Sequence, residues 1–126
     1  MKKLALASVM LIAGVLSTQV SVAHHSAAPF DFGNPVTVEG IVKELRIVNP
    51  HAVIVLEVTD DERGTRDIEF EGMSASIFYR SGYYNGAVNV GEKLTVSIAP
   101  RHDGEDGGFI SSFVTARGEQ FGFGVP

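Results

Sequence analysis

The sequence predicts a mainly β fold, a small five-stranded OB-like barrel with one short helix between its third and fourth strands. Apolar and polar residues alternate in five segments after residue 35, which is the period of a β-strand. A helix-length stretch without this period separates the third segment from the fourth. The order β-β-β-α-β is that of an OB fold, which closes its strand edges. An open α+β sheet is the alternative for the same order.

The first strand is predicted from Val36 to the break at Asn49-Pro50, because proline cannot donate a hydrogen bond to a neighbouring strand. Its apolar residues change face beside Gly40. A glycine at such a change predicts a β-bulge or a sharp bend. The bent strand would then serve two sheets of a small barrel. The two sets of apolar residues are Val36, Val38 and Val42 on one parity, and Ile41, Leu45 and Ile47 on the other.

Turns and polar loops bound the other elements. Asp60–Gly64 is a charged turn, and Pro100–Gly108 is a long polar loop. Ser74 is placed to cap the helix and Gly82 to end it. The predicted strands are Ala52–Thr59, Thr65–Glu71, Glu92–Ala99 and Phe109–Ala116, the helix runs through Arg80, and a glycine-rich tail follows the last strand.

The first residues predict a cleaved export signal. Lys2 and Lys3 precede an apolar run, Leu4–Leu16, and small residues lead to a cleavage point after Ala23. That run is shorter than the roughly 20 residues of a membrane span. We therefore expect a periplasmic protein with no membrane span after signal removal. The predicted organisation is a signal peptide over 1–23, an N-terminal arm over 24–35 and one OB-like domain over 36–126. We expect the rings of Phe30 and Phe32 to pin the arm to the body.

Composition narrows the function. The chain has no cysteine, which excludes disulfides, thiolate metal sites and cysteine nucleophiles. Its formal net charge of −5 becomes −7 without Lys2 and Lys3, and an acidic surface repels nucleic acid. No serine lies in a nucleophile-elbow context, and the paired carboxylates of Glu69 and Glu71 fit an exposed strand face. We therefore expect neither a nucleic-acid-binding protein nor an enzyme.

Four histidines are the candidate metal ligands. Cleavage after Ala23 would give His24 a free amine beside its imidazole, with His25 next to it. His51 lies in the loop between the first two predicted strands and His102 in the loop between the last two; in an OB fold these loops flank one ligand-binding face. Imidazole and amine donors suit copper(II), nickel or zinc, with affinity highest for copper. We rank His102 last among the four.

Simpler interpretations stand beside the metal site. His24 and His25 can be solvated residues of a loose end, His51 can cap its turn, and His102 can be merely exposed. The rival function is a module that binds an envelope protein partner or small ligand through an aromatic face. In that case Tyr83 and Tyr84 are expected to lie exposed beside a groove.

Several short motifs together resemble an uncharacterised family of small exported bacterial proteins. The resemblance covers nearly the whole chain after the signal, and it implies export and a compact β fold but brings no known activity. Members often carry a tryptophan where this chain has Tyr83 after Gly82, which suggests a slot for an aromatic side chain. The motifs are His24-His25-Ser26, Phe30-Asp31, Asn49-Pro50-His51-Ala52, and Gly91-Glu92-Lys93-Leu94 with Pro100.

Overall fold

Six strands and one short helix form the fold within residues 29–123, the part of the chain that the computed structural model describes. No helix among these residues is long and apolar enough to cross a membrane. The mainly β class and the order of the first five strands and the helix agree with the prediction, whereas the sixth strand was not predicted. The elements are β1 (Val36–Arg46), β2 (Val53–Asp60), β3 (Gly64–Gly72), α1 (Ala75–Arg80), β4 (Lys93–Pro100), β5 (Gly108–Thr115) and β6 (Gln120–Gly122).

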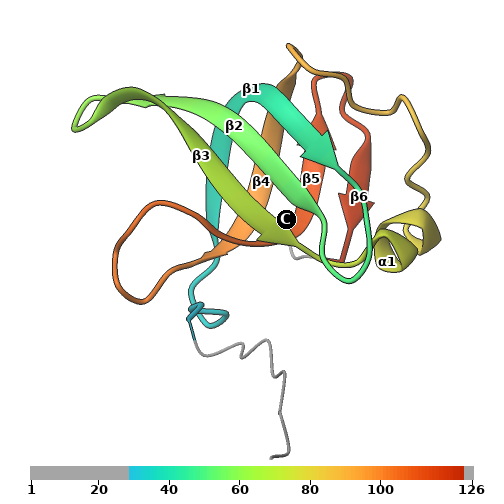
Figure 1. Ribbon diagram of the computed structural model, residues 1–126, viewed down its shortest axis with the longest axis horizontal. Coiled ribbons are helices and arrows are strands. Elements are labelled where there is room, and N and C mark those ends of the chain that lie inside the picture. Colours follow the sequence, from blue (N-terminus) through green and yellow to red (C-terminus); the bar gives the residue numbers. More distant parts are fainter. Residues whose placement is uncertain (1–28, 124–126) are drawn as a thin grey trace, which may run out of the picture.

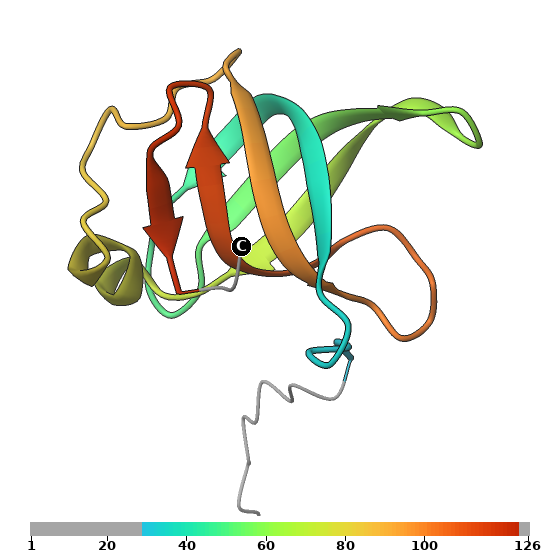
Figure 2. The same cartoon turned by 180° about the vertical axis from the view of Figure 1, so that it is seen from behind.

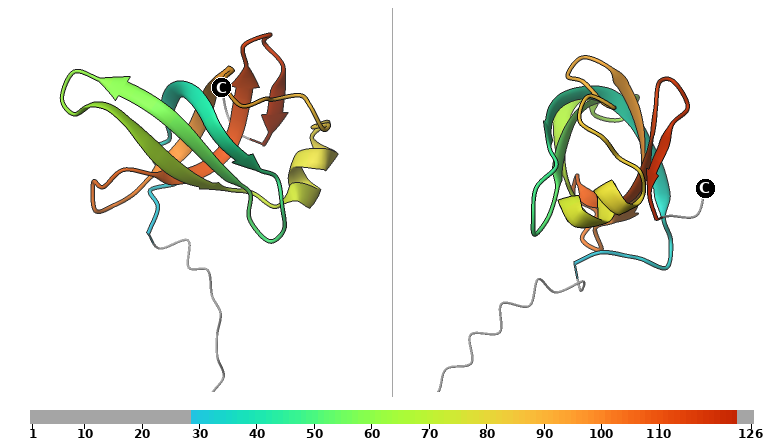
Figure 3. Two further views of the ribbon diagram at one scale, coloured as in Figure 1. Left: turned by 45° about the horizontal axis from the view of Figure 1, so that its top comes forward. Right: turned by 90° about the vertical axis from the view of Figure 1, so that its right-hand side faces the viewer.

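The described strands belong to one sheet in the order β3-β2-β1-β4-β5-β6, with antiparallel neighbours (Figure 1). A further parallel pairing joins β3 to β5, where Glu71 pairs with Phe109 and Gly72 with Ile110. This pairing closes β1 to β5 into a ring, which the right-hand view of Figure 3 shows nearly end-on. An open sheet would lack it. β6 lies outside the ring as an added edge strand beside β5 (Figure 2).

β1 bends because its two halves pair with different neighbours. Val36–Ile41 pairs with β4, and Ile41–Arg46 pairs with β2. The predicted change of face does occur, but not at Gly40: the register shifts between Val42 and Glu44, where Lys43 is the extra residue. Gly40 has another role. A Cβ there would lie 2.7 Å from the Glu57 carbonyl oxygen, so the glycine lets β1 and β2 approach closely.

The apolar core fills the ring. Alternate residues of each strand point inward, as the period of two predicts. Ser74 caps α1 by accepting a hydrogen bond from the Ile77 amide, and α1 lies across the lower part of the ring opening (Figure 3). Phe78 of α1 is fully buried, with its ring centroid 5.2 Å from that of Phe113. The largest fully buried side chains are Phe70, Phe78, Phe113, Ile54, Leu56, Leu94, Ile110, Val42 and Val96.

β6 is held by contacts with β5 and with the end of α1, which its three-residue sequence does not predict. Phe121 is buried against Phe113, with ring centroids 5.6 Å apart. The Gly122 amide donates to the Ser81 hydroxyl at 2.7 Å, which ties β6 to the end of α1. A strand therefore forms where the sequence predicts only a glycine-rich tail.

We expect Gly40→Ala to destabilise the fold, because the new Cβ would collide with the Glu57 carbonyl and the Leu56 side chain. The loss should be about 1–3 kcal/mol of unfolding free energy, as is typical of overpacking. Urea denaturation followed by circular dichroism measures it. Thr37→Ala, at an exposed position of the same strand, is the control. Equal urea midpoints for the two variants would contradict the close approach at Gly40.

Candidate functional site

Two of the four predicted metal ligands fall within the described residues. His51 lies in the connection between β1 and β2, and His102 in the loop between β4 and β5, as predicted. His24 and His25 lie outside the described range 29–123. The site is therefore built here from His51 and its surroundings.

The ring of His51 is held by β3. Its Nδ1 lies 3.1 Å from the Gly72 carbonyl oxygen and 3.4 Å from Glu71 Oε1. The ring also meets Phe109 of β5 edge-on, with centroids 6.1 Å apart. Because a carbonyl oxygen only accepts hydrogen bonds, Nδ1 must carry the proton in this contact. Nε2 of the neutral ring is then an acceptor or a metal ligand.

The backbone beside His51 is fixed on two sides. Ala52 is fully buried; its amide donates to the Met73 carbonyl at 3.0 Å, and its carbonyl accepts from the Gly72 amide at 2.7 Å. On the other side, Asn49 Oδ1 accepts from the amide and hydroxyl of Ser76 in α1. The loop that carries His51 is thus bonded both to the end of β3 and to the helix.

The N-terminal arm is pinned beside this histidine. Phe30 and Phe32 both pack on Phe109, with centroid distances of 5.8 and 5.6 Å. The Asp31 amide donates to the Pro100 carbonyl at 2.8 Å, and Phe30 forms an isolated β-bridge with Arg101. Phe109 therefore touches both the arm and His51. The prediction that the two phenylalanines anchor the arm to the body is confirmed.

His102 faces a different neighbourhood. It is exposed, and its amide donates to the Pro29 carbonyl at 2.9 Å. The hydrogen bond from Asn34 is the largest cause of the lowered pKa of the nearby Asp31, and His102 adds a smaller electrostatic effect. The nearby carboxylate of Asp103 is bound by the Arg101 guanidinium, which holds its pKa at about 2. Asp103 is thus engaged with an arginine and is not placed as a metal ligand or as a partner for His102.

An ion-pair network fixes the β4–β5 loop to β3. Arg66 binds Asp106 with two hydrogen bonds of 2.7 and 2.9 Å and also donates to Asp60 at 2.7 Å. Hydrogen bonds from Arg66 keep the pKa of Asp106 below its usual value. Asp60 also accepts from the amides of Glu62 and Arg63, which closes the charged β2–β3 turn. The Asp60 carboxylate is therefore engaged within the turn and with Arg66.

A polar pocket of about 140 Å³ lies between this loop and β3. Glu69 and Glu71 point outward from β3 with the two-residue spacing of one strand face. Glu71 is the member that reaches His51. The outside of the β3–β5 seam therefore brings together a histidine, carboxylates and an anchored arm. The lining residues are Phe30, Glu69, Glu71, Arg101, Asp106, Gly107 and Gly108.

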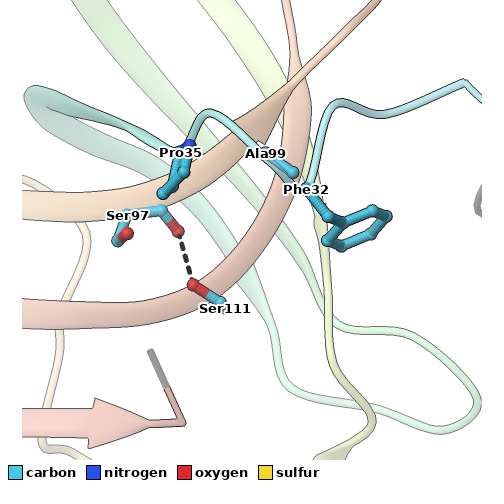
Figure 4. Close-up of a pocket in the computed structure, with 5 residues that line it drawn as sticks. All are labelled: Phe32, Pro35, Ser97, Ala99 and Ser111. Carbon is cyan, nitrogen blue, oxygen red and sulfur yellow. Dashed lines mark hydrogen bonds between the residues drawn. The ribbon is translucent and has the colours of Figure 1, made fainter. Parts of the chain in front are cut away.

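A second pocket, of about 160 Å³, lies on the β4–β5 side of the arm (Figure 4). Phe32, Pro35 and Ala99 give it a mostly apolar wall. Its polar groups are Ser97 and Ser111, and the Ser111 hydroxyl donates to the Ser97 carbonyl at 3.3 Å. None of these five lining residues carries an ionisable side chain that could bind a metal ion.

Tyr83 and Tyr84, which the alternative function requires to be exposed, differ in burial. Tyr83 is buried among Tyr79, Phe113 and Phe121, and this burial raises its pKa. The expectation that it lies exposed beside a groove is therefore wrong, since its ring fills the core at the end of α1. Tyr84 is 47% exposed, and its hydroxyl donates to Glu119 at 2.9 Å.

Within residues 29–123, no group of three or more histidine, aspartate or glutamate side chains is arranged to hold a metal ion. His51 can supply one nitrogen donor through Nε2, because its Nδ1 is turned to Gly72. Any complete metal site at this position needs donors from outside the described residues or from a partner.

Sequence reasoning missed Glu71 and Phe109 as neighbours of His51. The two residues lie far apart in the chain and meet only because β3 and β5 pair in parallel. The alternation of inward-facing and outward-facing residues along β3 and β5 could have predicted this contact. Glu71 and Phe109 stand outside the inward-facing sets of their strands, so a closing β3–β5 pairing would have placed them side by side on the outer surface.

The fold and the site define a small, mainly β protein with a ring of paired strands and a held histidine on its outer seam. The chain belongs to the family of unknown function DUF6152, whose profile matches residues 12–111. Comparison with curated proteins and with solved structures found no match to this chain.

We expect Asp106→Asn to lower the free energy of unfolding at neutral pH and to lower it less at acidic pH. The folded-state pKa of Asp106 is lowered, so its stabilisation is present above the unfolded value near 3.8 and is lost as the pH falls through the folded value. Urea midpoints at about pH 7 and about pH 2.5 test this. Asp61→Asn, an exposed carboxylate of the β2–β3 turn, is the control. A deficit of equal size at both pH values would argue against the Arg66 pair as the cause.

Proposed function

We propose that this is an exported, non-enzymatic protein with an OB-like barrel that binds a transition-metal ion, copper(II) first and zinc second. The proposed ligands are His51 together with His24 and His25 of the processed N-terminus. The observation that carries the proposal is the hydrogen-bonded ring of His51, whose Nδ1 is 3.1 Å from the Gly72 carbonyl oxygen. Metal-ligating histidines commonly donate their second ring nitrogen in this way.

The arm makes the second set of donors accessible. The rings of Phe30 and His51 both contact Phe109, which keeps their centroids within roughly 12 Å of each other. His25 precedes Phe30 by five residues, a length of chain that spans up to roughly 16 Å. The N-terminal histidines are therefore within reach of His51.

The donor set supports the choice of metal. Imidazole nitrogens and an N-terminal amine are ligands of intermediate softness, and the divalent series gives its highest affinity at copper(II). The chain has no cysteine, so it offers no thiolate that would favour copper(I). Met73 does not change this, because its side chain packs against the core.

The strand pairing supports the OB-like part of the proposal. β1 pairs with both β2 and β4, and the parallel β3–β5 pairing closes the ring. The helix follows β3, as in the OB order. Export and a periplasmic location are supported by the basic, apolar and small-residue order of residues 1–23.

A second candidate function is recognition of an envelope protein partner, with the histidines incidental. It is favoured by Phe32, which is 52% exposed and forms a wall of the apolar pocket of about 160 Å³. Such a pocket suits one apolar side chain of a partner. This function predicts that a chelator leaves partner binding unchanged.

Copper(II) titration of the exported, processed protein tests the proposed metal site. The full chain is produced with its own N-terminal segment, and mass spectrometry verifies that it begins at His24. We expect His51→Ala to raise the dissociation constant for copper(II) at least about tenfold, because one nitrogen donor is lost. His102→Ala, whose residue lies beside Asp31, should leave the constant unchanged. Micromolar or weaker binding that His51→Ala does not alter would refute the proposal.

A further inference from the structure

We infer that Asn85 is a site of spontaneous covalent modification, at which the side-chain amide is lost through a cyclic succinimide formed with the Gly86 nitrogen. The pair lies in the connection between α1 and β4, which runs along the outside of the fold (Figure 1). Both residues are exposed. The inference goes beyond the proposed function and does not depend on metal binding.

The two reacting groups sit in a turn and are not blocked. The Ala87 amide donates to the Tyr84 carbonyl at 3.1 Å, so Asn85 and Gly86 are the two central residues of a β-turn. The φ of +87° at Gly86 is that of the second central residue of a type II turn. Within the part of the chain that the structure describes, neither the Gly86 amide nor Asn85 Nδ2 is hydrogen-bonded. The nucleophile and the leaving group are therefore both accessible to water.

The carboxamide of Asn85 is polarised by a neighbour from the helix. The Tyr79 hydroxyl donates to Asn85 Oδ1 at 2.8 Å. This bond draws electron density from Cγ and stabilises the negative charge that develops on Oδ1 when a nucleophile attacks. Glycine has no Cβ, so no side chain of Gly86 hinders the approach of its nitrogen to Cγ.

The reaction needs only water as a co-reactant. The Gly86 nitrogen forms a bond to Asn85 Cγ, the Cγ–Nδ2 bond breaks, and ammonia leaves with the proton that the Gly86 nitrogen gives up. Water then opens the ring. Hydrolysis at Cγ gives aspartate, whereas hydrolysis at the main-chain carbonyl gives isoaspartate, in which the main chain runs through Cγ. Either product adds a negative charge, and isoaspartate also puts an extra carbon into the chain directly before the buried Ala87 and Val88.

The other asparagines of the chain lack at least one of these conditions. Asn34 and Asn49 each precede a proline, whose nitrogen has no proton to lose. Asn89 precedes Val90, whose branched side chain crowds its own amide. The Asn89 Nδ2 also donates to Glu92 at 3.2 Å, which restrains the carboxamide. The inference is therefore specific to Asn85.

The two aspartates that precede a glycine are held by arginines in an unreactive form. The Arg101 guanidinium binds Asp103, and that of Arg66 binds Asp106. These bonds lower the pKa of both carboxyl groups. An ionised carboxylate must take up a proton before an amide nitrogen can displace one of its oxygens. At neutral pH the fold thus leaves Asn85 as the reactive residue of this kind.

Incubation of the folded protein at mildly alkaline pH, followed by peptide fragmentation in a mass spectrometer, tests the inference. We expect residue 85 to gain about one dalton and to be found partly as isoaspartate, with Asn89 unchanged. Gly86→Ala should slow the reaction at least roughly fivefold, because a Cβ hinders the attacking nitrogen. Gly64→Ala is the control. It also places a Cβ in open space at a positive φ, and so carries similar backbone strain, but it should leave the rate at Asn85 unchanged.

Two results would overturn the inference. If Asn85 stays intact in the folded protein while the same residue deamidates in protein unfolded by urea, the turn protects the pair. An equal rate in Gly86→Ala and in the unchanged protein would exclude attack by the Gly86 nitrogen.

Discussion

Two residue pairs, Glu71 with Phe109 and Gly72 with Ile110, join β3 to β5 and close the ring of strands. Inside the ring, the closure puts Phe70 and Ile110 into one core with Phe78 and Phe113. Outside it, Glu71 and Phe109 become neighbours. The arm packs on Phe109 and the ring of His51 meets both residues. The core and the candidate site thus depend on the same short parallel pairing.

The candidate site lies on the outer seam of the ring and not in its interior. The interior is filled by apolar side chains, whereas the polar pocket lies between β3 and the β4–β5 loop. Arg66 holds that loop through Asp106 and the β2–β3 turn through Asp60. This network fixes the loop next to the anchored arm. The charged residues near the site therefore serve mainly to set its shape.

The period of two and the turn residues were enough to predict five strands, the helix and the Ser74 cap. They were not enough to place the bulge, because the face of β1 changes at Lys43, and only the β2 register reveals the extra residue. β6 was missed because the sequence around it is rich in glycine and the strand depends on contacts of Phe121 and Ser81 with distant segments. For the site, His51 and the anchoring role of Phe30 and Phe32 could be read from the chain. The burial of Tyr83 and the contact of Glu71 with His51 depend on pairings between distant segments.

The central proposal is that a metal ion binds beside Phe109, on which both the arm and His51 pack. Paramagnetic broadening of the amide NMR signals by copper(II) tests it most directly, since broadening falls steeply with distance from the ion. With less than one equivalent of copper(II), we expect the signals of Phe30, His51, Gly72 and Phe109 to broaden first. Those of the β2–β3 turn at Asp60–Gly64 should stay sharp. Broadening that spares His51 and Gly72 and spreads over other acidic segments would contradict the account.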